Sequence, residues 1–353
     1  MTFEKIEKEK TAVLGATGLV GQQFIRLLQN HPLFSLDCLV ASDQKQGQAY
    51  ADAVKWRIGD AIPDEIKQKK LAAFSLEEIK RKGIRYIFSA LPASISHPVE
   101  SALRDSGCAV FSNSSAFRMD PEVPIVVPDV NPEHLELIRR QQQHYGGYIV
   151  TNPNCSTAGI VTVLKPLLPF GLNDVYVSTY QSVSGGGLNG VSAMEIQNNV
   201  IPYIPKEEKK IRIESMKILN DPDCHIVASC CRVPILYSHL VSLVVNLKKE
   251  VPLSGIISSL CSFSNLPEGL SLHLAPENSI EICDEIDRPQ PALDFPLPYE
   301  PKNAMVVKVG RIEKVGKSLK MFLLFNNTLK GAAGSSVLNA EIMLQKTRTG
   351  VLS

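Results

Sequence analysis

The sequence predicts an α/β protein with two domains: a doubly wound, mainly parallel sheet, followed by an α+β domain whose sheet is mostly antiparallel. Three observations predict this fold class. Short apolar strand patterns alternate with helical patterns in the first 150 residues, whereas residues 151–329 contain longer strands in which apolar and polar residues alternate. The 353 residues are also enough for two hydrophobic cores.

The composition excludes several classes of protein. Lys and Arg number 37 against 36 Asp and Glu, so there is no basic field that would attract nucleic acid. Residues 3–10 mix both charges, unlike a signal peptide, and no apolar run reaches membrane-spanning length. The 8 cysteines are scattered without a Cys-x-x-Cys pair, which argues against a disulfide framework and a zinc site. We therefore expect a cytoplasmic protein that holds no metal.

The first predicted element is a buried strand at residues 11–14, which leads into glycines at 15, 18 and 21 and then a helix to residue 28. This spacing is typical of a dinucleotide-binding turn, because residues without side chains let the backbone approach a pyrophosphate at the helix N-terminus. A tight turn without a ligand is the alternative. The strand before it and the helix after it favour a Rossmann-type dinucleotide site.

Further elements continue this domain. Strands are predicted at residues 36–41 and 86–90, with helices at 63–70 and 76–82 between them. Ser42 follows the second strand, where a ribose is usually recognised, but Asp43 comes one step later than the acidic residue expected for NAD. The residues therefore leave the choice between NAD and NADP open.

Cys155 follows the turn-forming run Asn152-Pro153-Asn154 and precedes a predicted helix at residues 156–168. The unpaired amides and positive dipole of a helix N-terminus favour a thiolate and an oxyanion formed beside it. Cys155 is therefore a candidate nucleophile. The alternative is an ordinary buried cysteine, since free cysteine is among the most often buried residue types.

The remaining elements form the second domain and its return to the first. An extended surface crossing is predicted at residues 288–301 and a C-terminal helix, packed back on the first domain, from residue 330. The predicted strands lie at residues 174–182, 226–235, 239–247 and 305–314. We thus expect residues 1–150, completed by the helix of residues 330–353, to form the dinucleotide-binding domain, and residues 151–329 to form the catalytic domain.

Along essentially its whole length, the chain resembles the aspartate-β-semialdehyde dehydrogenase family, most closely the archaeal and fungal-type branch. The matching segments occur in order at residues 15–21, 112–120, 127–134, 152–157, 181–187, 207–210, 232–234 with His239, and 327–333. So many ordered matches make a chance likeness untenable.

The resemblance implies the roles of the catalytic residues. Cys155 would attack an acyl phosphate, Gln181 would help to hold the covalent intermediate, and His239 would act as the acid or base. A thiolate is a strong nucleophile, and the resulting thioester is activated enough to accept a hydride. From its pattern alone, His239 would be assigned to the core or to an edge strand.

Four charged residues would bind the substrate. The resemblance places the phosphate, or inorganic phosphate, at Arg118 and Lys210, and the amino and carboxylate groups at Glu207 and Arg232 respectively. Arginine offers a planar fork to carboxylate or phosphate, and lysine a compact charge. Without the resemblance, Glu207 and Lys210 would be an exposed pair on one helix face.

The resemblance also implies NADP as cofactor, although Gln44 stands where NADP-preferring members carry Arg or Lys. Ser184 and Gly185 would lie against the nicotinamide, and Asn327 would contact it from the C-terminal segment. The expected cofactor-binding residues are Gly15, Thr17, Gly18, Leu19, Val20, Ser42, Ser184, Gly185 and Asn327.

The implied activity is the NADPH-dependent reduction of L-aspartyl 4-phosphate to L-aspartate 4-semialdehyde through a cysteine thioester. It would serve the biosynthesis of lysine, threonine, methionine and diaminopimelate, in a homodimer or homotetramer that assembles through residues 151–329. Two alternatives remain: a reductase of another acyl phosphate, such as N-acetyl-glutamyl phosphate, and a non-catalytic dinucleotide-binding homologue. Glu207 favours a substrate with a free amino group.

Overall fold

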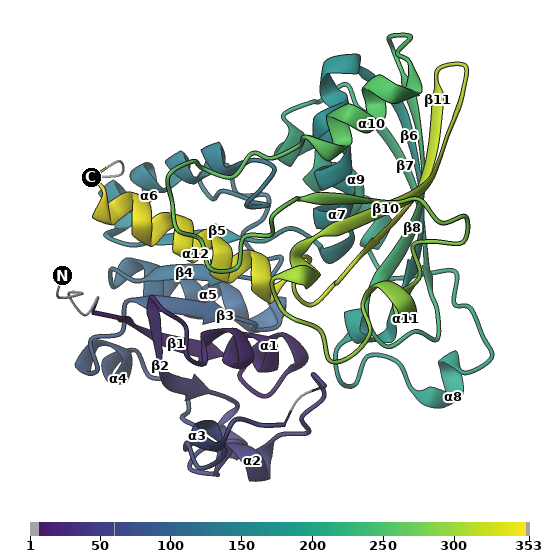
Figure 1. Ribbon diagram of the computed structural model, residues 1–353. Coiled ribbons are helices and arrows are strands. Elements are labelled where there is room, and N and C mark those ends of the chain that lie inside the picture. Colours follow the sequence, from purple (N-terminus) through teal and green to yellow (C-terminus); the bar gives the residue numbers. More distant parts are fainter. Residues whose placement is uncertain (1–6, 60, 351–353) are drawn as a thin grey trace, which may run out of the picture.

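The computed structural model describes residues 7–59 and 61–350 and contains two sheets with separate cores (Figure 1). The first sheet is parallel throughout, in the order β2-β1-β3-β4-β5. The second is mixed, in the order β7-β6-β8-β11-β10-β9. Three of its five strand pairs are antiparallel, so the predicted fold class is confirmed. Residues 1–6 and 351–353, the ends of the predicted first domain, lie outside the described residues.

Every residue of β3, β4 and β5 is buried, because helices cover both faces of the first sheet. One face packs against α1, α6 and α12, and the other against α4 and α5. The strands are β1 (Glu9–Leu14), β2 (Phe34–Val40), β3 (Tyr86–Ser89), β4 (Ala109–Ser112) and β5 (Tyr148–Thr151). The helices are α1 (Leu19–Leu28), α2 (Tyr50–Ala53), α3 (Asp64–Lys67), α4 (Leu76–Arg81), α5 (Ala93–Asp105), α6 (Ile138–Tyr145) and α12 (Ala333–Arg348).

The second sheet is covered on one face. Buried and accessible residues alternate along β8, and α7, α9 and α10 cover the face that is turned toward the first sheet (Figure 1). The strands are β6 (Leu172–Gln181), β7 (His225–Arg232), β8 (His239–Leu247), β9 (Ile280–Cys283), β10 (Val307–Val315) and β11 (Ser318–Phe325). The helices are α7 (Cys155–Leu164), α8 (Ala193–Ile196), α9 (Glu207–Leu219), α10 (Leu253–Cys261) and α11 (Pro291–Asp294).

Several predicted elements differ in extent from those observed. The helix expected at residues 156–168 is α-helical only to Leu164 and continues as a 3₁₀ helix, in which Pro166 and Pro169 lack the amide that an α-helix needs. The helix expected at residues 63–70 is the single turn α3. No strand was predicted over β5, β9 or β11. The signal for β11 was the apolar run that follows the turn glycine Gly316.

A buried ion pair joins the two halves of the chain just before α12. Lys330 Nζ lies 2.6 Å from each carboxylate oxygen of Asp129, and both side chains are almost inaccessible to solvent. Two opposite charges in such a place are tolerated only together, because either one alone would be buried without compensation.

We expect Lys330→Met to lower the free energy of unfolding by about 3–5 kcal/mol, since it leaves the Asp129 carboxylate buried and unpaired. Urea unfolding of the purified protein measures the change. The double variant Lys330→Met with Asp129→Leu removes both charges and should recover part of the loss. A single variant that unfolds at the urea concentration of the unmodified chain contradicts this account of the pair.

Candidate active site

The predicted catalytic and substrate-binding residues converge on one cleft of about 490 Å³. Its lining includes Cys155 at the start of α7, Gln181 at the end of β6, Arg232 at the end of β7, and Glu207 and Lys210 in the first turn of α9. Arg118, Ser184, Gly185, Asn327 and Val20 also line it. His239 lies against Cys155. The side chain of Leu19 is buried and lines neither this cleft nor the adjoining cavity described below.

Asn154 sets the start of α7 and hence the place of the Cys155 sulfur. Its side-chain oxygen accepts hydrogen bonds from the amides of Ser156 and Thr157 at 3.0 and 3.2 Å, as an N-cap asparagine does. Cys155 is therefore the first residue of the helix. The amides of Ser156 and Thr157 already donate to this cap, so they are less free to stabilise an oxyanion than the sequence led us to expect.

His239 is completely buried at the start of β8, and its Nε2 lies 3.3 Å from the Cys155 sulfur. The backbone amide of Ser182 donates to Nδ1 at 3.1 Å, so Nδ1 must carry a lone pair. The neutral ring therefore holds its proton on Nε2, facing the sulfur. Burial and the charge of Arg232 lower the pKa of His239 to about 3, which keeps the ring neutral at physiological pH.

The thiol of Cys155 is harder to ionise than its helix position suggested. Burial, and next the charge of Glu207, raise the pKa of Cys155 to about 12. Arg232, Arg118 and the Ser156 amide act in the opposite direction without overcoming burial. The expectation that the helix N-terminus yields a ready thiolate is thus wrong, because burial outweighs the helix position.

The influence of Glu207 can be tested by alkylation. In Glu207→Gln, the carboxylate no longer opposes the thiolate, so the pKa of Cys155 falls and its reaction with iodoacetamide at one pH should be about fivefold faster. The measurement is the rate of Cys155 labelling from about pH 7 to about pH 10. In Glu208→Gln, which alters the exposed neighbour of Glu207 on α9, the labelling rate of Cys155 should depend on pH as it does in the unmodified chain. A Glu207→Gln curve at unchanged or higher pH contradicts the assigned cause.

Glu207 connects the segment around Cys155 to the predicted substrate-binding residues. Its Oε1 accepts from the Asn154 side-chain amide at 2.8 Å and from the Gln181 amide at 3.0 Å. Lys210 Nζ lies 4.0 Å from Oε2. Gln181 and Arg232 face each other as register partners on β6 and β7, and Arg232 donates to the Ser182 carbonyl at 2.8 Å. Glu207 and Lys210, which the sequence alone would place as an exposed pair on a helix face, therefore both belong to the cleft.

Two glycines allow the chain to pass close to these groups. A Cβ on Gly185 would lie 2.7 Å from Arg232 Nη1 and 3.2 Å from His239 Cε1. A Cβ on Gly331 would lie 2.7 Å from the Cβ of Cys155. Both approaches are closer than any side chain tolerates, so the cleft depends on glycine at both places. Asn327 connects the two segments that flank these glycines. Its Oδ1 accepts a hydrogen bond from the Ser238 amide, and its Nδ2 donates one to the Ser184 hydroxyl.

A second cavity of about 540 Å³ adjoins the cleft at Leu91 and contains the glycine turn. Gly15 has a φ of +73°, and a Cβ on Gly21 would lie 2.2 Å from the Gly15 carbonyl oxygen. Gly18 caps α1 without any side chain, so the first amides of the helix face the cavity free of a side-chain cap. Gly15, Thr17, Gly18, Ser42 and Asp43 all line the cavity. Its shape and donors fit the pyrophosphate and ribose of a dinucleotide.

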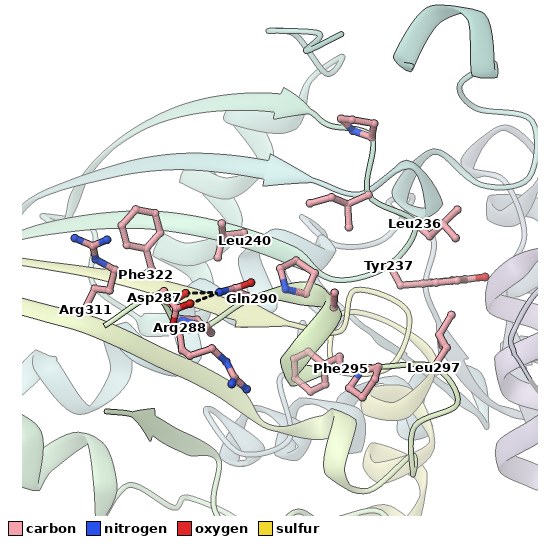
Figure 2. Close-up of a pocket in the computed structure, with 16 residues that line it drawn as sticks. Leu236, Tyr237, Leu240, Asp287, Arg288, Gln290, Phe295, Leu297, Arg311 and Phe322 are labelled. Atoms are coloured by element: carbon pink, nitrogen blue, oxygen red, sulfur yellow. Dashed lines mark hydrogen bonds between the residues drawn. The ribbon is translucent and has the colours of Figure 1, made fainter. Parts of the chain in front are cut away.

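A third cavity, of about 740 Å³, lies elsewhere (Figure 2). It is lined mainly by apolar side chains and prolines, among them Leu236, Leu240, Phe295 and Phe322, and holds none of the predicted catalytic residues. Figure 2 shows Gln290 hydrogen-bonded to Asp287 at its edge. Because this cavity holds none of the predicted catalytic residues, we assign it no part in the chemistry of the cleft.

Sequence reasoning assigned no role to Ser182 or Glu214, and named Asn154 only as part of the turn before Cys155. Glu214 binds Arg118 Nη1 at 3.0 Å and the Asn154 amide at 2.5 Å. Its position seven residues after Glu207 on the same helix was the available signal. Among the residues described, no cluster of three or more His, Cys, Asp or Glu side chains suited to a metal occurs, and no helix is long and apolar enough to cross a membrane.

A cysteine with a histidine at its sulfur, in a cation-lined cleft beside a cavity that fits a dinucleotide, is the arrangement expected of a nucleotide-dependent dehydrogenase with a thiol nucleophile. Comparison with known proteins agrees with this class. Residues 10–138 match the semialdehyde dehydrogenase NAD-binding domain, and residues 164–330 match the semialdehyde dehydrogenase dimerisation domain. The chain belongs to the aspartate-semialdehyde dehydrogenase family of oxidoreductases.

Individual relatives confirm the resemblance seen in the sequence. The chain is 41% identical to aspartate-semialdehyde dehydrogenase of Archaeoglobus fulgidus, over 95% of this chain and 97% of that one. It is 38% identical to the enzyme of Schizosaccharomyces pombe, over 96% and 98%. The structure of the Candida albicans enzyme with NADP superposes with a TM-score of 0.86 at 32% identity, over 97% of this chain and 99% of that one.

Proposed function

We propose that this chain reduces L-aspartyl 4-phosphate to L-aspartate 4-semialdehyde with NADPH. The observation that carries the proposal is the contact of Cys155 with His239 in a cleft that combines three cations with a carboxylate and opens beside the dinucleotide cavity. The related enzyme of Candida albicans that binds NADP supports this choice of cofactor. Residues 1–150 with the C-terminal helix would bind the dinucleotide, and residues 151–329 would carry the catalytic groups.

The proposed reaction begins at sulfur. The Cys155 sulfur gives up its proton, which leaves with the phosphate, and attacks the acyl carbon; the bond from that carbon to the phosphate oxygen breaks, and phosphate leaves toward Arg118 and Lys210. Bound NADPH would supply the hydride that reduces the thioester carbon. The carbon–sulfur bond then breaks to release the aldehyde, and the sulfur leaves as a thiolate, which the Nε2–H of neutral His239 stabilises by a hydrogen bond until solvent reprotonates it. The two guanidinium groups near Cys155 favour its negative charge at the start and the end of this sequence.

The remaining charged groups orient the substrate. Arg232 would bind its carboxylate, and Glu207 its amino group, because a free ammonium group needs an anionic partner. Gln181, held by Glu207 on one side, would hold the covalent intermediate. Ser184, Gly185 and Asn327 also line the cleft. The missing side chain of Gly185 would let a flat nicotinamide ring approach the backbone there.

The function is tested in the reverse direction. Purified protein should reduce NADP when given L-aspartate 4-semialdehyde and phosphate, and should turn over much more slowly when phosphate is omitted. N-acetyl-glutamate semialdehyde and NAD serve as the competing substrate and cofactor. Preferential turnover of the acetylated aldehyde would replace the proposed substrate, and the absence of turnover with either aldehyde would favour the non-catalytic alternative.

We also propose that the protein works in the cytoplasm, in the biosynthesis of lysine, threonine, methionine and diaminopimelate. All 8 cysteines are free in the structure, as expected for a chain in a reducing compartment. The substrate and products are small and carry charge, so they would be exchanged with the surrounding solution through the open cleft.

A homodimer is the assembly we propose, formed through the uncovered face of the second sheet. Tyr176, Tyr180 and Val227 are large side chains that lie exposed on this face. Leu240 and Phe322, on neighbouring strands, line the cavity of Figure 2. The matched dimerisation domain spans these strands. Sedimentation of Val227→Glu should show monomers where the unmodified chain shows dimers; a monomeric unmodified chain would contradict the proposal.

A further inference from the structure

Glu214 is a buried carboxylate, 2% exposed, that lies behind the cleft and for which the proposed chemistry provides no role. It lies two turns beyond Glu207 on α9 and has two partners from distant parts of the chain. Its Oε1 pairs with Arg118 Nη1 at 3.0 Å, and its Oε2 accepts the backbone amide of Asn154 at 2.5 Å. One side chain thus connects the residue before the nucleophile to a cation of the cleft.

The contact with Arg118 fixes the plane of the guanidinium group. Nη1 is held by Glu214, and Nη2 donates to the Asn113 carbonyl at 3.0 Å, so two of the three nitrogens are anchored. A planar group held at two points cannot rotate. Arg118 Nε is buried without a hydrogen-bond partner in the described structure, although Arg118 lines the cleft. The anchored arginine therefore keeps binding capacity for an anion.

The contact with Asn154 acts on the nucleophile. α9 holds Asn154 twice, through its backbone amide by Glu214 and through its side-chain amide by Glu207. The side-chain oxygen of the same asparagine caps α7, which begins with Cys155. Any displacement of Glu214 therefore moves the sulfur and Arg118 relative to each other.

A further residue of α9 strengthens this arrangement. Lys217 donates to the carbonyl oxygens of Arg118, Asp120 and Val123 at 2.8, 2.7 and 3.1 Å. Glu207, Lys210, Glu214 and Lys217 are spaced three, four and three residues apart, which places them on one helix face. This face of α9 therefore holds the loop that follows β4 against the turn that precedes α7.

We infer that Glu214 is a positioning residue that sets the distance and orientation between the phosphate-binding guanidinium of Arg118 and the sulfur of Cys155. The inference rests on the proposed function, because it takes Arg118 as a phosphate-binding group. The two carboxylates of α9 then have different roles, since Glu207 faces the substrate, whereas Glu214 orders the groups around it.

The test measures phosphate binding without turnover. Inorganic phosphate bound beside Arg118 should shield Cys155 from iodoacetamide, and the phosphate concentration that halves the labelling rate reports its affinity. In Glu214→Gln, which keeps the size but loses the charge, this concentration should rise about tenfold, because a charge-assisted contact to Arg118 is lost. In the assay, KM for phosphate should rise by the same factor and KM for the aldehyde by much less.

Two further variants separate positioning from general damage. Glu208→Gln removes an exposed carboxylate one residue after Glu207 and should leave both constants within about twofold. Glu214→Asp keeps the charge but shortens the reach, and should raise the phosphate constant by only about threefold; it replaces Glu214→Gln if that variant does not fold. Equal loss of affinity for phosphate and aldehyde would indicate a structural role only.

The outcomes distinguish the inference from the function on which it rests. If phosphate protects Cys155 but aspartate semialdehyde is not turned over, the proposed substrate is wrong and the role of Glu214 is still measured. If both Glu214 variants bind phosphate as the unmodified chain does, or if phosphate protects none of the proteins, the role assigned to Glu214 is overturned.

Discussion

Cys155→Ser is expected to lower kcat by about 10⁴-fold or more while leaving the fold unchanged. The serine hydroxyl fills nearly the same volume between His239 and the backbone of Gly331, so the packing is preserved. It is a far weaker acid than a thiol, however, and Glu207 with the surrounding burial already opposes ionisation at this position. An oxygen ester would also accept a hydride less readily than a thioester.

The measurement combines the NADP-reduction assay with thermal unfolding of the same preparation. Cys261→Ser is the matched control, because this cysteine is exposed on α10 and does not line the cleft. It should keep activity within about twofold. If Cys155→Ser retained a tenth of the activity, the covalent mechanism would have to be abandoned.

His239→Ala is expected to lower kcat by about 10²-fold, because the thiolate loses the Nε2–H that stabilises it when it forms and when it leaves. Glutamine can place an N–H near the sulfur, so His239→Gln should keep more activity than His239→Ala. His225→Gln changes an exposed histidine that contacts Asp174 and should remain active.

The pH dependence adds a second readout for His239. Because its pKa lies near 3, the unmodified enzyme should show no histidine ionisation in its activity between about pH 6 and about pH 8. The Nε2 proton is present in the neutral ring throughout that range. An activity that falls with a midpoint near the ordinary histidine pKa, and loses this midpoint in His239→Gln, would contradict the lowered pKa of His239.

Much of the site was predictable because its signals are local. The spacing of Gly15, Gly18 and Gly21 between a strand and a helix predicts the dinucleotide turn, and the structure places these residues at the start of α1. Asn154 before Cys155 predicts a helix start, which is where α7 begins. Roles for Arg118, Gln181 and His239 came only from the resemblance, since nothing in their neighbourhood in the chain distinguishes them from core or surface residues.

Other features could not be predicted because their causes are distant in the sequence. Glu214 contacts Arg118, which lies 96 residues earlier in the chain, and the amide that sets the tautomer of His239 belongs to Ser182, the residue just after β6 and 57 residues before the histidine. Cys155 has its pKa raised by burial and by Glu207, neither of which the residues around it reveal. The sequence therefore led to the wrong sign for its ionisation.

The sequence by itself determined the fold class, the glycine turn and the position of Cys155 at a helix start, because hydrophobic periodicity, glycine spacing and capping act over a few residues. Only the tertiary structure decided the protonation state of Cys155, the tautomer of His239 and the anchoring of Arg118 and Asn154 by one carboxylate. These depend on burial and on charges that packing brings together across the two sheets, and electrostatic effects are set by distance in space, not along the chain.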